Sequence, residues 1–424
     1  MFHNYDEEVR LKWMSDWSPV QTFSTWPEYK PDMDHLNQDC FENQLVRALA
    51  SLEDNLKLWA ASKNPFCKNL YNKFSNIYRL KHHVGEVKIP SDFYPKLANW
   101  LNNKQDLLQD VKHQYILHIY NEYMREHAVF SPLRANRPQS SSGINPYEYS
   151  KKIILESAVQ CDFCNYLKHT SEDIFGRIKT NRSVSAANTF KVDRWHSLII
   201  PLKHSLLDLD EDDVIDMFEA AEAWLAKVHS LEPIYKYPWL MWDIMPHAGA
   251  SQVHPHVHVG LTPDYYVGIY ENMRRGAELY YQRYKANFFQ DLVEIHAALG
   301  LAVTAGETTA FAQITSRKDT EVTVISRRPN KDFYRFIYYI YKAFMDVGFY
   351  DFSSLTVHPI MGSSGTEGSL PAIIRISSRG NVADIKSEIS SFELYQFANL
   401  NFDPYKIIQH VNSSLNTRRK DSRP

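Results

Sequence analysis

One order of predicted elements occurs twice in the chain and restricts the folds that it can adopt. In the first copy, the hydrophobic pattern predicts a strand over Ser197–Pro201, a helix from about Asp208 to Val228, and two strands over 238–245 and 254–261. The second copy has strand patterns over 309–314 and 321–326, a helix over 331–346, and strands over 354–359 and 370–376. This repetition predicts an α+β fold built from two copies of one unit, with helices packed on antiparallel strands.

Composition excludes several functional classes. The 424 residues carry 47 basic and 50 acidic side chains, a net charge of −3, so no overall field favours nucleic acid or an anionic membrane. Neither GxGxxG nor GxxxxGK[ST] occurs, which argues against Rossmann and P-loop nucleotide sites. No run of 18 apolar residues and no basic-then-apolar start is present. We therefore expect a cytoplasmic protein without a nucleic-acid or membrane partner.

The regions outside the two copies have their own patterns. Residues 1–128 lack alternating β patterns, and 41–61 carry apolar residues at three- and four-residue spacing, so we expect a helical N-terminal extension. The polar stretch 138–146 has the composition of a loop, and the tail 413–424 is expected to be frayed.

Two local motifs carry possible chemistry. Side chains alternate along a strand, so His254, His256 and His258 are expected on one face, where neutral imidazoles can attack phosphorus, bind metal or move protons. A merely structural row of histidines is the alternative. Cys161 and Cys164 have the C-x₂-C spacing of a metal site or, alternatively, of a redox dithiol. With only four cysteines in the chain, we do not expect a disulfide framework, and we expect the protein to reside in a reducing compartment.

These motifs together resemble the histidine triad superfamily, and specifically its galactose-1-phosphate uridylyltransferase branch. Ser251, His254, Pro255 and His256 match the pattern S-x-x-H-P-H, and 196–204 match H-x-L-x-I-P-x-x-H. Residues 130–138 resemble the two ends of the branch's F-N-P-L-R and R-x-K-R-P segments with the middle deleted. The resemblance implies a catalytic histidine-triad repeat over 129–264 and a second, degenerate repeat over 265–412. It does not cover residues 1–128.

The resemblance also implies an activity. His256 would be the nucleophile of a ping-pong transfer of the UDP-glucose:hexose-1-phosphate uridylyltransferase type, through a nucleotidyl-histidine. The implied partners are a nucleotide sugar and a sugar 1-phosphate, and the branch suggests a homodimer. Ser251 and the backbone of the Gly249 turn would donate hydrogen bonds to the phosphoryl oxygens. Arg134 and Arg137 would clamp a phosphate or the departing sugar phosphate, and a solvated pair of arginines is the alternative.

A metal is implied in the same way. In the family, the last histidine of I-P-x-x-H and the first of H-P-H complete a site with two cysteines. This assigns Cys161, Cys164, His204 and His254 to a structural zinc ion, which would fix the segment that presents the nucleophile two residues further on.

Three departures keep other functions open. His258 stands where uridylyltransferases have glutamine and histidine-triad hydrolases have histidine, which favours a nucleotide hydrolase or phosphorylase as an alternative. Asp243, at a substrate-binding position, replaces the usual asparagine, and a carboxylate repels phosphate unless it is protonated or paired. A non-catalytic nucleotide-sugar-binding protein is therefore a further alternative. The iron-site string E-x-x-H-x-x-x-H is missing from the second repeat, so no second metal is expected. Arg327 and Arg328 are expected to be exposed, and contact with a sugar phosphate across the interface of the two repeats is the alternative.

Overall fold

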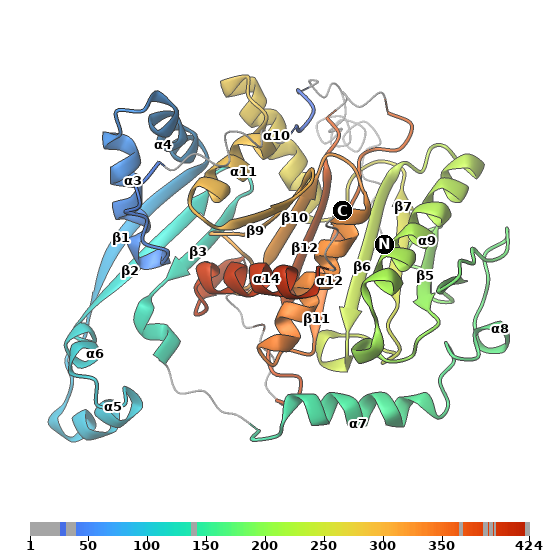
Figure 1. The fold of residues 1–424 in the computed structure, drawn as a ribbon, viewed down its shortest axis with the longest axis horizontal. Helices are drawn as coiled ribbons and strands as arrows, with labels where there is room; N and C mark the ends of the chain where they lie inside the picture. Colours follow the sequence, from blue (N-terminus) through green and yellow to red (C-terminus); the bar gives the residue numbers. More distant parts are fainter. Residues whose placement is uncertain are drawn as a thin grey trace, which may run out of the picture.

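The computed structural model describes residues 26–30, 40–136, 142–363, 368–384, 389, 393 and 396–419. Within this part of the chain, nine antiparallel strands form one sheet in the order β4-β5-β7-β6-β11-β12-β10-β9-β8 (Figure 1). The strands are β4 Ser183–Ala187, β5 His196–Pro201, β6 Tyr237–Ile244, β7 Val257–Thr262, β8 Ala302–Ala305, β9 Thr308–Ala312, β10 Val322–Ser326, β11 Phe352–Val357 and β12 Ala372–Ser378.

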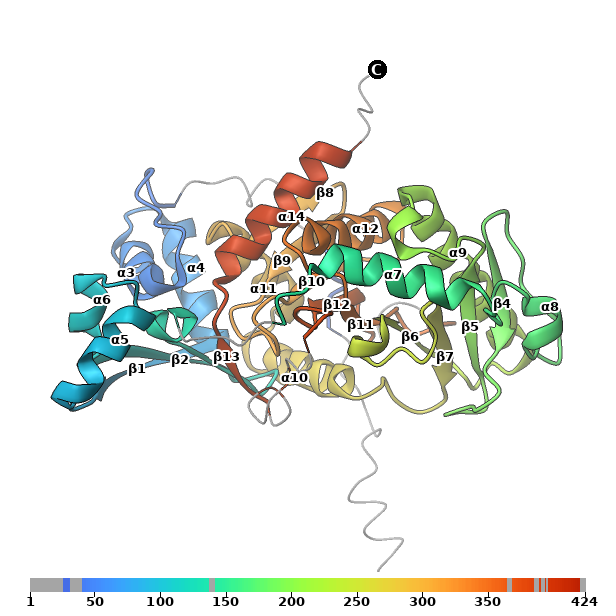
Figure 2. The same ribbon diagram turned by 90° about the horizontal axis from the view of Figure 1, so that it is seen from below.

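The predicted duplication is present in this sheet. The order β5, α9, β6, β7 recurs as β10, α12, β11, β12, and the two units meet where β6 pairs antiparallel with β11. Helices α9 (Glu211–Leu231) and α12 (Lys331–Asp346) lie on one side of the sheet, and α10 (Ile269–Tyr284) lies on the other (Figure 2). The α+β prediction with two repeats is confirmed.

Local sequence explains both central helices. Asp210 and Asp213 form a reciprocal capping box that starts α9 by satisfying backbone N–H groups of its first turn. Asn330 caps α12 by accepting a hydrogen bond from the backbone N–H of Phe333. Phe218 and Tyr334 stack between the helices with ring centroids 5.1 Å apart. This packing extends the core across both repeats.

A smaller sheet lies beside the first, and its strands show that the N-terminal extension is not purely helical as predicted. Its order is β1 (Tyr78–Glu86), β2 (His113–Asn121), β3 (Glu126–Phe130), β13 (Phe397–Leu400), and β13 runs parallel to β3. The extension predicted as helical does contain α3 Leu52–Ala61, α4 Pro65–Ile77, α5 Tyr94–Trp100 and α6 Gln105–Asp110. The prediction missed its strands because β1 is exposed along most of its length and both of its faces carry polar residues, so apolar alternation is absent.

A buried charge cluster joins the two sheets. Arg375 of β12 donates hydrogen bonds to the carboxylates of Glu126 in β3 and of Glu321, and Thr315 donates to Glu126. The side chains of Arg375, Glu126 and Glu321 are each no more than 5% exposed. Such a cluster specifies one docking position, because either partner left alone would be a buried unpaired charge.

The remaining helices enclose the two sheets. They are α7 Pro146–Ala158, α8 Tyr166–His169, α11 Phe288–Ala298 and α14 Pro404–Arg418. The predicted frayed tail is wrong for residues 413–418, which belong to α14. Leu415 is buried there, the Ser414 hydroxyl donates to the Tyr339 carbonyl, and Arg418 pairs with Asp346. Residues 420–424 lie outside the described part.

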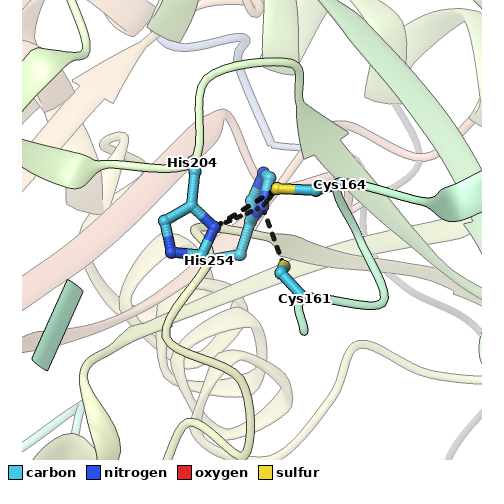
Figure 3. A group of neighbouring side chains, drawn as sticks. All are labelled: Cys161, Cys164, His204 and His254. Atoms are coloured by element: carbon cyan, nitrogen blue, oxygen red, sulfur yellow. Dashed lines mark hydrogen bonds between the residues drawn. The ribbon is translucent and has the colours of Figure 1, made fainter. Parts of the chain in front are cut away.

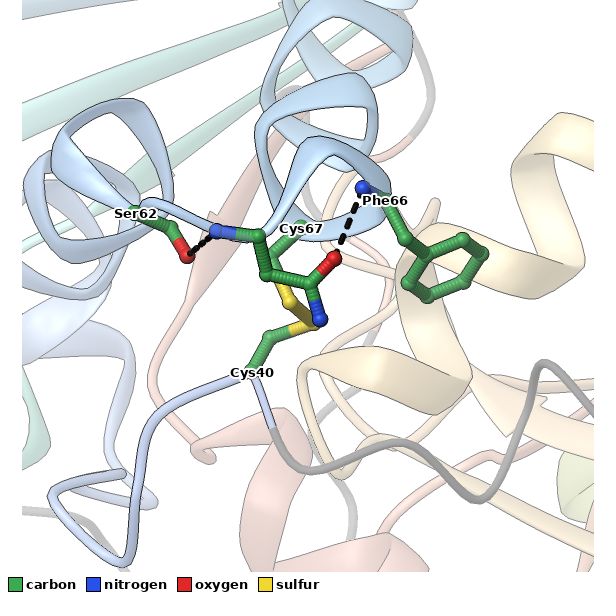
Figure 4. Close-up of a disulfide and its surroundings, with 5 residues drawn as sticks. Cys40, Ser62, Phe66 and Cys67 are labelled. Atoms are coloured by element: carbon green, nitrogen blue, oxygen red, sulfur yellow. Dashed lines mark hydrogen bonds between the residues drawn. A yellow bond between two sulfur atoms is a disulfide. The ribbon is translucent and has the colours of Figure 1, made fainter.

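The expectation of reduced cysteines is wrong for one pair. Cys40 and Cys67 form a disulfide between the segment before α3 and the first turn of α4 (Figure 4). Asn64 caps α4 next to it by accepting from the backbone N–H of Phe66 at 2.9 Å. The 27-residue separation hides this pair from any local motif. Among the described residues, no helix combines the length and apolarity needed to cross a bilayer.

Candidate active site and metal centre

The histidine row begins before the strand that was predicted to carry it. His254 and His256 precede β7, and only His258 lies in it. Pro255 has no backbone N–H to donate to a neighbouring strand, which delays the start of the ladder. The three side chains still lie close together, with 5.2 Å between the ring centroids of His256 and His258.

The surroundings of His256 determine its tautomer. Its Nδ1 lies 2.9 Å from the carbonyl oxygen of His254, and a carbonyl only accepts, so Nδ1 carries the proton. The lone pair is then on Nε2. The residue is 4% exposed, and burial lowers its pKa, which favours the neutral ring. Phe163, from the loop between the two cysteines, holds the ring edge-on at a centroid distance of 5.1 Å. The arrangement fixes the orientation of an imidazole ring whose neutral form is favoured by burial.

Hydrogen bonds also hold His258 in place. Its Nδ1 lies 2.9 Å from Nε2 of His196, and His196 is held in turn by the backbone N–H of Val192, 3.2 Å from its Nδ1, and by the Asn188 amide nitrogen, 3.3 Å from its Nε2. Burial lowers the pKa of His258 to about 3 and that of His196 to about 4, so both rings are neutral near pH 7. His196 matched the family pattern, but the sequence assigned it no role.

Four predicted ligands converge in one cluster. The Sγ atoms of Cys161 and Cys164 lie 3.4 and 3.6 Å from Nδ1 of His254, while Nδ1 of His204 lies 3.2 Å from Nδ1 of His254 and 3.5 Å from the Cys164 sulfur (Figure 3). All four ligand atoms lie within 4.8 Å of one another. The cysteines follow α7, His204 follows β5, and His254 precedes β7.

The chemistry of this donor set fits a metal. Nε2 of His254 donates to the Pro201 carbonyl at 2.8 Å, and Nε2 of His204 lies 3.1 Å from the Ile154 carbonyl, so both rings present unprotonated Nδ1 atoms to each other. Two lone pairs facing at 3.2 Å repel unless a cation lies between them. A tetrahedral zinc site with ordinary bond lengths would give about 3.3 Å between nitrogens and about 3.6 Å between nitrogen and sulfur. The observed spacings match, which favours a metal site over a redox dithiol.

Asp243 is partnered from the second repeat. It lies on β6, opposite Ser353 of β11, and its carboxylate is hydrogen-bonded to the Ser353 side chain. Arg379 donates to the Ser353 hydroxyl at 2.9 Å and to the Ala248 carbonyl at 3.0 Å. Burial raises the pKa of Asp243, against the lowering by Ser353 and Arg379. The expected repulsion of phosphate is thus reduced by partners that the first-repeat motifs do not contain.

A second pair supports the loop before the triad. The Nδ1 of His247 donates to the buried carboxylate of Asp351, whose pKa burial raises to about 6. Met245 adopts a left-handed φ of 70° while 1% exposed, and Gly249 has a φ of 106°. Backbone strain of this kind persists only where neighbouring contacts hold it. Asp351 directly precedes β11 and Arg379 directly follows β12, and neither belongs to a motif that sequence analysis recognises.

The remaining predicted site residues have no described contact with the three histidines. Ser251 is exposed in the loop before His254. The backbone N–H of Gly249 itself donates to the Pro246 carbonyl at 3.0 Å, and the role of Ser251 and of this turn toward phosphoryl oxygens stays a prediction. Arg134 lies in the short 3₁₀ segment Pro132–Asn136 after β3 of the smaller sheet, and Arg137 lies outside the described residues. The arginine clamp therefore stays a prediction.

Comparison with known proteins is informative at the level of fold. No protein-family model matches the chain, and no curated protein matches its sequence. An ADP-glucose phosphorylase from Arabidopsis thaliana, solved with bound ADP-glucose, is similar over 70% of this chain and 98% of its own, with a TM-score of 0.53 and 13% identity. The chain therefore shares its fold with this ADP-glucose phosphorylase.

Two further structures are less similar. A galactose-1-phosphate-uridylyltransferase-like protein from A. thaliana covers 60% of this chain and 91% of its own at 12% identity, with a TM-score of 0.49. A uridylyltransferase covers 56% of this chain and 86% of its own at 12% identity, with a TM-score of 0.46.

Proposed function

We propose that this chain is a nucleotidyltransferase that acts through a nucleotidyl-histidine on His256, in the manner of UDP-glucose:hexose-1-phosphate uridylyltransferases. The observation that carries the proposal is the hydrogen bond from Nδ1 of His256 to the His254 carbonyl, which leaves the Nε2 lone pair for attack on phosphorus. The neighbouring His258, neutral and held through its Nδ1 by His196, would assist at the phosphoryl oxygens.

The reaction then has two displacements. In the first, Nε2 of His256 forms a bond to the α-phosphorus of the nucleotide sugar, the bond from that phosphorus to the bridging oxygen breaks, and sugar 1-phosphate leaves with the electron pair. In the second, a phosphate oxygen of the acceptor attacks the same phosphorus, the phosphorus–nitrogen bond breaks, and Nε2 regains its lone pair. One difficult exchange is thus divided into two easier steps.

The acceptor distinguishes two versions of this reaction. A hexose 1-phosphate would yield a new nucleotide sugar, whereas inorganic phosphate would yield a nucleoside diphosphate and make the protein a phosphorylase. His258, which replaces the glutamine of uridylyltransferases, favours the second version, as does the fold shared with a phosphorylase that binds ADP-glucose.

Product analysis tests both versions. The protein is incubated with UDP-glucose or ADP-glucose and either galactose 1-phosphate or inorganic phosphate. We expect product with one acceptor and a loss of about 10⁴-fold or more in His256→Ala, since that change removes the nucleophile. Release of nucleoside monophosphate alone would indicate hydrolysis. Turnover retained in His256→Ala would refute covalent catalysis.

We further propose that Cys161, Cys164, His204 and His254 hold a structural zinc ion. The ion would fix the ring of His254, and through its backbone the position of His256; it would supply no catalytic chemistry itself. Metal analysis of purified protein should find one zinc per chain. Cys161→Ser should lose it and melt at a lower temperature, because site assembly contributes to folding. Lys168→Ser, an exposed change on α8 close to the cysteine loop, is the matched control. Unchanged metal content and melting temperature in Cys161→Ser would contradict the site.

A further inference from the structure

The second repeat contains a pocket that the proposed reaction does not use. It has a volume of about 330 Å³ and lies at the ends of β10 and β11, with Arg327, Arg328 and His358 among its lining residues. The pocket is lined by the segment between β11 and β12. The corresponding segment of the first repeat lies between β6 and β7 and carries His256. The duplicated unit therefore has a hollow at the place where the first repeat carries His256.

The pocket is separate from the catalytic histidine. Pro238, at the start of β6, lines the pocket and pairs with Leu261 of β7, whereas Met241 of the same strand pairs with His258. The rise of about 3.3 Å per residue along a strand places His256, five residues before Leu261, on the order of 17 Å from the pocket, toward the opposite ends of these two strands. A ligand in one site does not occupy the other.

The charge of the pocket favours an anion. Arg327 is neutralised by a bidentate pair with Glu28, at 2.7 and 2.6 Å. The exposed guanidinium of Arg328 forms no hydrogen bond or ion pair with the described residues, as its predicted exposure implied. The other acidic lining residue, Glu222, is half-buried; burial raises its pKa, against the lowering by its hydrogen bond with Tyr334. Helix α12 begins three residues after Arg328, so its positive dipole end adds to the field.

An unsatisfied histidine points to a ligand. His358 follows β11, is 5% exposed, and its buried Nε2 has no hydrogen-bond partner among the residues that the structure describes. Burial lowers its pKa to about 3, so the ring is neutral and can either donate or accept. Leaving a buried polar nitrogen unpaired costs free energy that a bound ligand would recover. Leu225, Pro238 and Leu370 supply apolar wall.

We propose that this pocket binds a small phosphate monoester with a hydroxylated body, such as a sugar phosphate or a nucleoside monophosphate. Arg328 pairs with the phosphate, His358 hydrogen-bonds to the ligand, and Glu222 accepts from a hydroxyl. The volume exceeds that of a lone phosphate ion and lies at the lower end of the range for small-molecule sites. The site is additional to the proposed reaction and does not depend on it.

Calorimetric titration of the whole chain with α-D-glucose 1-phosphate and with AMP tests the site. Wild type should bind at least one probe at a site that persists in His256→Ala. Arg328→Gln and His358→Gln should each weaken that binding about tenfold or more, because each removes a polar partner of the ligand. Lys331→Gln removes a nearby cation that does not line the pocket, and it should change binding by less than about twofold.

Several results would overturn the proposal. These are no binding of either probe, binding that Arg328→Gln and His358→Gln leave unchanged, or binding that His256→Ala abolishes. The last result would place the probe in the catalytic site, which would support the proposed function while removing the second site. The Arg328→Gln variant should still form the nucleotidyl adduct on His256. This result separates a failure of the second site from a failure of the proposed function.

Discussion

Replacing Cys40 by alanine should destabilise the protein by an amount set by the length of the loop that the disulfide closes. The Cys40–Cys67 bond spans 27 residues. In the chain-entropy treatment, closing such a loop removes about 12 cal/mol/K from the unfolded state, which is about 3.5 kcal/mol of stability at 25 °C. Both cysteines are buried, at 7% and 1% exposure, so lost packing adds to this figure.

Urea unfolding followed by tryptophan fluorescence measures the loss. Cys40→Ala and Cys67→Ala should each cost about 3.5 kcal/mol or somewhat more, and the double variant should cost far less than their sum, because both changes break one bond. Thiol titration of the denatured protein with a chelator should find two reactive thiols in wild type and three in Cys40→Ala. Four reactive thiols in wild type, or a loss below about 1 kcal/mol, would refute the reasoning.

Three other predictions concern stability. Glu126→Gln should cost about 3 kcal/mol in urea unfolding because it leaves Arg375 short of a buried countercharge; an unchanged midpoint would mean that the cluster does not hold the sheets together. Gly260→Ala should cost about 1–3 kcal/mol, since a Cβ there would lie 2.2 Å from the Trp239 ring; a neutral result would contradict this packing. Burial lowers the pKa of His296 to about 4, below its unfolded value. Its contribution to the free energy of unfolding is therefore complete above about pH 6.5 and is lost as pH falls toward 4. His296→Leu should reduce the acid-side slope of unfolding free energy by up to about 1.4 kcal/mol per pH unit; an unaltered slope would exclude this linkage.

Local motifs predicted the features that depend on neighbouring residues. The periodicity of α12 gave its bounds, Lys331–Asp346, because its apolar face and Asn330 cap are contiguous in the chain. The four metal-site residues were assigned from short motifs through a family resemblance, and the structure brings them together.

Long-range pairings were not predictable from those motifs. The parallel pairing of β13 with β3, the Cys40–Cys67 bond and the contact of Arg379 with the Ala248 loop each join residues far apart in sequence. None of them leaves a periodic or spaced pattern. The same holds for the tautomer of His256, which depends on the backbone geometry at His254.

The central claim is that His256 carries the nucleotidyl group. Intact mass measured after exposure to UDP-glucose, UDP-galactose, ADP-glucose, GDP-sugars or a diadenosine polyphosphate tests it most directly. The quench must avoid acid, which would cleave the phosphorus–nitrogen bond. We expect an added mass of one nucleoside monophosphate with at least one donor in wild type and none in His256→Ala. No adduct with any donor, or the same adduct in both proteins, would contradict the account.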